Sequence, residues 1–217
     1  MLEDRNTQLI NQFTLEATDA GSIVYVTRDY SLLKEQLSKL VKEHCIRRIV
    51  KSDWMSETNI GLKEYLIKMG VEVIETNYVD YWIKRNSEKI NATQPSSDIK
   101  NKCDADTRKE FIRRTYANAD MGISEASIAI AETGSVLLTS NEGNDRFVTL
   151  IPRIHLSLID CQNIVATMDE ATERIKSGEI PTFLTYLTGR NTTGDIPGAL
   201  GSTAQGPELE YIILFNC

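Results

Sequence analysis

The sequence predicts an α/β protein with three layers (α/β/α), in which helices cover both faces of a mostly parallel sheet. In the first half, short β-branched or aromatic runs alternate with segments whose apolar residues recur at helical spacing. The second half is richer in strand-like runs. Strands that alternate with helices form βαβ units, and these build parallel sheets covered on both faces. The 217 residues are enough for one sizeable core, so we expect a single domain over 1–217.

The first elements follow from local signals. We expect residues 1–20 to form a helical lead-in and Ile23–Val26 to form the first strand, after the turn at Asp19–Gly21. A second strand is expected at Arg48–Val50. The helix between these two strands has an apolar face formed by Leu33, Leu37, Leu40 and Val41.

A further helix and strand complete the first half. The helix spans about Leu62–Met69 and ends at Gly70, a residue typical of the position just past a helix C-terminus. Val71–Ile74 is the third predicted strand. Residues 86–102 are polar and predict a loop, and a helix is expected from about Asp104 to Ala117.

The second half contains more strand signals than helix signals. Thr167 and Glu170 form a capping box that predicts the start of a helix. Pro181 suits a first helical turn and predicts a last short helix. Four strands are expected, at Ser127–Ile130, Ser135–Leu138, His155–Ile159 and Tyr211–Phe215.

Charge and hydropathy exclude several classes of protein. The net charge is −7, and basic residues occur only in short pairs such as Arg47–Arg48, so no basic stripe suits nucleic acid. No run approaches the roughly 20 apolar residues that span a bilayer. The N-terminus lacks a basic segment followed by an apolar run, so we expect no secretory signal. The sequence therefore predicts a cytoplasmic protein without nucleic-acid or membrane partners.

The cysteines and histidines predict neither a metal site nor a cluster. The four cysteines are widely spaced and form no CxxC pair, and there are only two histidines. Metal and cluster ligands usually show short local spacings. Adjacent His44 and Cys45 come nearest to such a pattern, but a position at a helix end explains them better. We therefore expect free thiols, no metal and no cofactor.

A first polar segment lies between two apolar runs. Glu132 is a carboxylate in an apolar context, where it is costly unless it is paired or used. Thr133 and Gly134 supply a hydroxyl and a backbone that can approach a ligand closely. After a polar turn, Arg146 offers a planar guanidinium suited to a carboxylate or phosphate. A plain β-hairpin around Thr133–Gly134 explains the same residues equally well.

A second segment is rich in glycine and hydroxyl residues. It begins at Thr188–Gly189 and continues past Asp195. Such a loop can form a nest of backbone N–H groups around an anion, or it can be a surface connection. His155, in an apolar strand, is more often a core histidine than a base on spacing alone. No Ser–His–Asp or Cys–His set can be assembled from the spacing, and the glycines do not match a dinucleotide fingerprint.

Motifs in order along most of the chain resemble the lactate-utilisation (LUD) family, and more its iron–sulfur proteins than its smaller members. The resemblance covers roughly residues 20 to 215. The matching pieces are Val50–Ser52, Ile60–Leu66, Gly70–Thr76, Ala129–Gly134, Thr139–Asn144, Ile151–His155, Thr188–Gly189 and Gly206–Leu214.

The resemblance implies a fold like that of ribose-phosphate isomerase, glucosamine-phosphate deaminase and the CoA transferases. It also implies a part in oxidising L-lactate to pyruvate, as a ligand-binding subunit that works with iron–sulfur partners. Under this interpretation Glu132 and His155 are the candidate catalytic residues. The candidate ligand-binding residues are Lys51, Ser52, Thr133, Gly134, Asn141, Glu142, Gly143, Asn144, Arg146, Thr188 and Gly189.

The sequence departs from the family in three places. The iron–sulfur proteins of the family continue into cysteine-rich ferredoxin-like segments, whereas this sequence ends at Cys217 and lacks them. The stretch from Asn77 to about Lys102 diverges, and the family's Gly-Pro-Ser-Arg and His-Gly-Pro correspond here to Gly189–Thr192 and Gln205–Pro207. These differences leave three hypotheses open: a ligand-binding subunit for a small anion, a stand-alone enzyme acting on a sugar phosphate or CoA thioester, and a non-catalytic module. The substrate, the oligomeric state and catalytic competence stay open.

Overall fold

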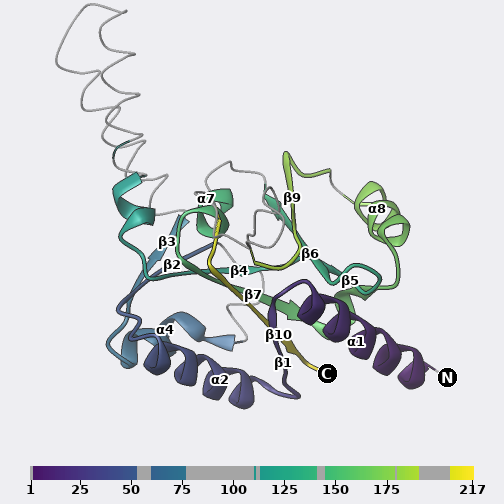
Figure 1. The fold of residues 1–217 in the computed structure, drawn as a ribbon, viewed down its shortest axis with the longest axis horizontal. Coiled ribbons are helices and arrows are strands. Elements are labelled where there is room, and N and C mark those ends of the chain that lie inside the picture. The colour runs from purple at the N-terminus through teal and green to yellow at the C-terminus, as the bar shows by residue number, and fades with distance from the viewer. Residues whose placement is uncertain are drawn as a thin grey trace, which may run out of the picture.

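In the computed structural model, two β-sheets and their helices form a layered α/β fold (Figure 1). The structure describes residues 2–52, 60–76, 110, 113–140, 145–178, 180–190 and 206–217. The predicted α/β class with three layers is confirmed, because a parallel central sheet carries helices on both faces. No helix in the described ranges is long and apolar enough to cross a membrane.

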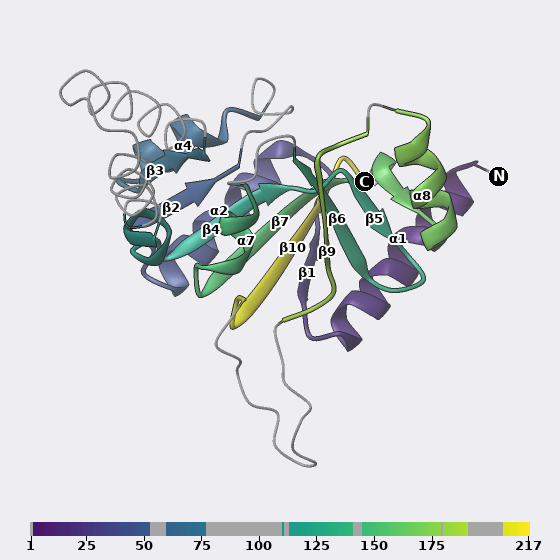
Figure 2. The same ribbon diagram turned by 90° about the horizontal axis from the view of Figure 1, so that it is seen from above.

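The central sheet has six parallel strands in the order β1-β10-β7-β4-β2-β3. Figure 2 shows β4, β7, β10 and β1 side by side. The strands of the central sheet are β1 (Ile23–Val26), β2 (Arg48–Lys51), β3 (Glu72–Glu75), β4 (Met121–Glu125), β7 (Ile154–Asp160) and β10 (Leu209–Phe215). The sequence predicted all of these except β4, which lies in the middle of the sheet.

One face of the central sheet packs against α2 (Tyr30–Glu43) and α4 (Leu62–Lys68). Asp29 caps α2, because its Oδ1 accepts hydrogen bonds from Ser31 N and Leu32 N at 2.8 and 2.9 Å. The apolar stripe predicted for α2 is buried. The cap explains where this helix begins, and the apolar stripe explains how it docks.

The other face of the central sheet packs against α1 (Leu2–Asp19), α7 (Asp145–Leu150) and the second sheet (Figure 1). α7 was not predicted. It approaches β4 closely at Gly122, where an added Cβ would overlap the carbonyl oxygen of Val148. Glycine at this position therefore lets the helix backbone rest on the sheet.

The second sheet has four strands in the order β8-β5-β6-β9. Its strands are β5 (Ile128–Ile130), β6 (Ser135–Ser140), β8 (Ile164–Val165) and β9 (Phe183–Leu187), and β8 follows the short helix η1 (Cys161–Asn163). β5 and β6 are antiparallel, so the hairpin interpretation of the first polar segment is confirmed.

Helix α8 (Met168–Lys176) covers the outer face of the second sheet. The predicted cap is present, because Thr167 Oγ1 accepts a hydrogen bond from Glu170 N at 3.2 Å. The helix predicted from Pro181 is wrong. β9 forms there instead, because its β-branched and aromatic residues pair with β6 along a sheet edge.

The prediction of free thiols is wrong for two cysteines. Cys161, directly after β7, and Cys217, after β10, form a disulfide with a Cα–Cα distance of 5.3 Å. The parallel pairing that places Phe215 opposite Asp160 brings the two cysteines together although 56 positions separate them in the sequence. Cys45 is a free, exposed cysteine.

Candidate functional site

The topology of the central sheet points to a candidate ligand site. After β2 the chain runs outward to β3 at the edge, and then returns to β4 on the other side of β2. The reversal makes the carboxyl ends of β2 and β4 a topological switch point. Parallel α/β sheets bind ligands in the crevice outside this point. We use the name carboxyl-end cluster for the polar residues there: Lys51, Ser52, Glu75, Thr76 and Ser124.

Lys51 is the cation of this cluster, and it is deeply buried. Its side chain is only 2% exposed, and its Nζ lies 3.0 Å from Glu75 Oε1. Lys63, from α4, forms a second ion pair with the same carboxylate. Burial disfavours ionisation of Glu75, but hydrogen bonds from Lys63 and Lys51 outweigh it, so the pKa of Glu75 is lowered. Two ammonium groups thus converge on one ionised carboxylate at the end of β2 and β3.

Hydroxyl side chains form a row on the opposite face of the sheet. Ser124 and Ser157 are register partners on β4 and β7. The β2–β4 and β2–β3 registers, continued by one residue, place Ser52 beside Ser124 and Thr76 beside Ser52. All four are buried. Buried hydroxyls at adjacent strand ends can orient the polar groups of a small ligand.

A buried polar network adjoins this row. The Nε2 of His155 lies 2.8 Å from Ser124 Oγ, and its Nδ1 lies 2.8 and 3.0 Å from the two carboxylate oxygens of Glu210. Ser157 Oγ donates to Glu210 Oε1 at 2.9 Å. The side chains of His155 and Glu210 are 0% and 1% exposed. A hydroxyl, an imidazole and a carboxylate are therefore aligned across β4, β7 and β10, which the sequence analysis did not foresee.

Glu132 lies away from the carboxyl-end cluster. It is exposed, in the turn between β5 and β6, and its Oε1 accepts a hydrogen bond from Met168 N at 2.6 Å. This contact places the carboxylate at the first turn of α8, where a negative charge is favourable. Its catalytic role stays a prediction.

Four other candidates gather near the end of α1. Thr133 Oγ1 donates to Ser135 Oγ at 2.8 Å, and Ser135 Oγ lies 2.6 Å from Thr188 Oγ1. Gly134 and Gly189 both have positive φ, at 62° and 70°. An added Cβ would overlap the backbone of Ala17 at Gly134 and of Ala20 at Gly189. The close approach predicted for Gly134 is thus made to a helix backbone of the same chain.

Arg146 lies near the carboxyl-end side of the sheet. β6 ends close to Ser127, just beyond β4, and α7 then runs toward the start of β7. Arg146, in the first turn of α7, therefore lies on the side of the carboxyl ends. Its guanidinium is exposed and lies 5.8 Å from the ring centroid of Phe183. Because β6 separates Arg146 from Glu132 by about 17 Å or more, the two do not form one site. Asn141, Glu142, Gly143 and Asn144 lie outside the described residues.

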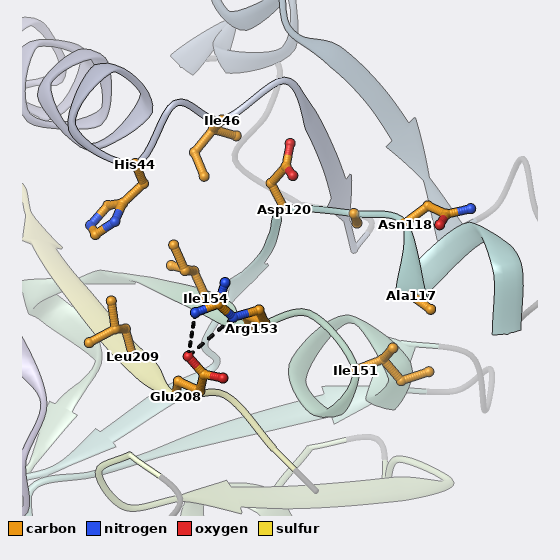
Figure 3. Close-up of a pocket in the computed structure, with 11 residues that line it drawn as sticks. His44, Ile46, Ala117, Asn118, Asp120, Ile151, Arg153, Ile154, Glu208 and Leu209 are labelled. Atoms are coloured by element: carbon orange, nitrogen blue, oxygen red, sulfur yellow. Dashed lines mark hydrogen bonds and ion pairs between the residues drawn. The ribbon is translucent and has the colours of Figure 1, made fainter. Parts of the chain in front are cut away.

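A cavity of about 300 Å³ opens at the other end of the central sheet (Figure 3). His44 and Ile46 line it before β2, Asp120 before β4, Arg153 before β7 and Glu208 before β10. Arg153 and Glu208 form an ion pair there. Since ligands of parallel α/β sheets bind at carboxyl ends, this amino-end cavity is not our candidate site.

Comparison with known proteins decides the family. The model of the LUD domain matches residues 10–215. The chain belongs to the LUD domain family. Lactate utilization protein B of Shouchella clausii (strain KSM-K16) is 25% identical over 95% of this chain and 48% of its own length. The protein of the same name from Bacillus subtilis (strain 168) is 27% identical over 87% and 45%. The LUD chain therefore spans about half the length of these relatives.

A solved structure supports the fold. A DUF162 family protein from Deinococcus radiodurans superposes with a TM-score of 0.61, at 20% identity, over 97% of this chain and 98% of the other. At this identity the likeness concerns the fold alone.

Within this LUD domain the sequence analysis found some members of the site and missed others. It named Lys51, Ser52 and His155. It missed Glu75, Ser124 and Glu210, whose positions depend on which strands are neighbours. A signal existed for Glu210, the single carboxylate in the otherwise apolar stretch Leu209–Phe215. For Ser124, in a strand that was itself not predicted, the sequence offered none.

Proposed function

We propose that this LUD domain binds a small carboxylate, lactate or pyruvate, at its carboxyl-end cluster and serves in lactate utilisation. The observation that carries the proposal is the buried ammonium of Lys51 at the switch point, paired with Glu75. A cation held in a poorly solvated place attracts an anion more strongly than an exposed lysine does. Relatives named lactate utilization protein B support the choice of substrate class.

Arg146 would supply a second cationic contact. It lies in the first turn of α7 at the same end of the sheet, and its guanidinium can bind a carboxylate in a bidentate manner. Ser52 and Thr76 would contribute hydroxyl contacts from β2 and β3. By the family resemblance, the domain would act together with iron–sulfur partners, which would carry the electrons released when lactate is oxidised.

A second candidate function is that of a stand-alone enzyme acting on a CoA thioester or a sugar phosphate. The aligned Ser124, His155 and Glu210 favour it, because a hydroxyl beside a carboxylate-oriented imidazole is the arrangement of many nucleophilic enzymes. Such an enzyme would bind coenzyme A or phosphate and turn over its substrate without a partner.

The test is a calorimetric titration of the purified chain with L-lactate, pyruvate, inorganic phosphate and coenzyme A. We expect binding of lactate or pyruvate, weakened roughly ten- to a hundredfold by Lys51→Met, because a charged hydrogen bond is lost. Lys39→Met is the matched control, since the Lys39 side chain is exposed on the solvent side of α2, in a surface pair with Glu35. Equal affinity in the two variants would contradict the proposal, and binding of coenzyme A alone would favour the second candidate.

A further inference from the structure

Ser124 is the residue at which the buried polar network meets the carboxyl-end cluster. It is the penultimate residue of β4, on the strand beside β2 at the switch point. The hydrogen bond from Ser52 N to Ile123 O, 3.0 Å long, joins β2 and β4 next to it. Beyond Glu125, which still pairs with Leu158 of β7, the chain leaves the central sheet and turns into β5. Ser124 therefore lies one residue from the carboxyl end of β4, beside Ser52 at the switch point.

The network holds the Ser124 hydroxyl in one place. Its Oγ lies 2.8 Å from His155 Nε2, and His155 is fixed on its other side by both oxygens of Glu210. A serine hydroxyl has one donor and two acceptor sites. The contact with His155 uses one of them, whichever atom donates. Hydrogen-bonding capacity is left for a further partner, with an orientation that the imidazole determines.

Burying this hydrogen-bonded network in the sheet costs desolvation free energy, and the packing of the core does not require polar residues there. The same face carries apolar clusters on both sides, with Val50 and Val148 on one side and Ile159, Ile212 and Leu214 on the other. Apolar residues of similar size would continue these clusters without burying an ionisable pair, a replacement that is often neutral or stabilising. Buried ionisable groups beside a ligand-binding end are candidates for a functional role.

We propose that Ser124 is the ligand-contacting residue that recognises an oxygen on carbon 2 of the bound acid, and that His155 and Glu210 are its positioning residues. The inference rests on the proposed function, in which cations at the strand ends hold the carboxylate. It assigns to Ser124 the recognition of the carbon-2 oxygen that lactate and pyruvate share and that other small carboxylates lack. Ser124 would select acids that carry an oxygen on carbon 2, and the cations would attract the carboxylate.

Ser157 provides a matched control within the same network. It is as buried as Ser124 and lies opposite it in register, and it also donates a hydrogen bond to Glu210. It lies one strand farther from the switch point, on β7. Ser124→Ala and Ser157→Ala thus each remove one buried hydroxyl from the network, but only the first removes the proposed contact.

The experiment compares L-lactate with propionate, which lacks only the hydroxyl on carbon 2, by NMR titration of the folded protein. We expect the wild-type protein to bind lactate roughly tenfold more tightly than propionate, as one hydrogen bond allows. Ser124→Ala should remove this preference, because lactate loses a hydrogen bond that propionate does not make, whereas Ser157→Ala should retain it. Glu210→Gln should reduce the preference in the same direction. A general loss of stability would change both affinities together and not their ratio.

The outcomes separate the two proposals. If the wild-type protein binds neither acid, the proposed function fails and this inference fails with it. If both acids bind with equal affinity, or if Ser124→Ala keeps the preference for lactate, the domain is a carboxylate binder and the inference alone is overturned. An equal loss of preference in Ser157→Ala also overturns it, because the network would then act as a structural unit.

Discussion

His155 and Glu210 lie opposite each other on the adjacent parallel strands β7 and β10, and the imidazole Nδ1 contacts both carboxylate oxygens of Glu210, at 2.8 and 3.0 Å. Both side chains are buried from solvent. Ser124 contacts the other nitrogen of His155, and Ser157 donates to Glu210, so the imidazole and the carboxylate both have hydrogen-bond partners within the sheet. A buried pair of this kind is sensitive to the loss of one partner, because the other is left buried without compensation.

This relationship predicts a strongly non-additive response to mutation. Glu210→Leu should destabilise the fold by about 3–5 kcal/mol, and so should His155→Leu, because each removes the charged or ring partner of a buried pair. The double variant should lose clearly less than the sum, since two apolar residues can pack against Ile212 and Ile159. Urea unfolding of the four proteins measures the cycle. Additive losses would show that the two side chains do not stabilise each other.

The glycine in the β5–β6 turn is expected to act through packing. Gly134→Ala would combine an unfavourable positive φ with overlap of the Ala17 backbone. Gly70 is the matched control, because its φ is also positive, at 83°, but an added Cβ would meet nothing within 4 Å. Gly70→Ala should cost about 1–2 kcal/mol, and Gly134→Ala should cost about 1–3 kcal/mol more. Similar losses in the two variants, measured by thermal and urea unfolding, would contradict a packing role for Gly134.

The fold was predicted correctly where the local sequence pattern determines the structure. It was predicted wrongly where the structure depends on elements that pack against the segment from elsewhere in the chain. The helical spacing at Leu33 and Leu37 specifies α2 by itself. β4 was missed because Gly122 and Ser124 interrupt its apolar pattern. Glycine at position 122 lets the backbone of α7 approach the strand, and the hydroxyl of Ser124 forms a hydrogen bond with His155. Neither reason is visible until the strand order is known.

The candidate site shows the same division. Lys51 and Ser52 were named from a motif, and the structure places them at the switch point. Their neighbours at the site, Glu75 beside Lys51 and Ser124 beside Ser52, come from other strands and could be identified only through the strand register. β9 is a different case, because the two aromatic residues and the threonine of Phe183–Leu187 favour a strand, but Pro181 before them favoured a helix.

The disulfide between Cys161 and Cys217 should contribute measurably to stability. It closes a loop with a sequence separation of 56, for which chain entropy predicts about 4 kcal/mol. Cys161→Ser and Cys217→Ser should each lower the free energy of unfolding by a similar amount, and so should a reductant acting on the wild-type protein. Cys45→Ser is the control, because Cys45 is free and exposed. Mass spectrometry of the alkylated, unreduced protein identifies the pair. Full alkylation of both cysteines would show that the bond does not form.

The ion pairs of Glu75 predict a particular dependence of stability on pH. Because its pKa is lowered in the folded protein from its ordinary value of 4.5, the unfolded chain takes up a proton at higher pH than the folded one does. The stabilisation from Lys51 and Lys63 is therefore fully present above pH 4.5 and is lost as the pH falls through the lowered pKa. Urea unfolding from pH 7 to pH 3 should show a gap between the wild-type protein and Glu75→Gln that closes over this acid range. Glu35→Gln, which removes one partner of an exposed pair on α2, should show little gap at any pH. A gap between the wild-type protein and Glu75→Gln that stays constant down to pH 3 would mean that Glu75 stabilises the fold by packing rather than by its charge.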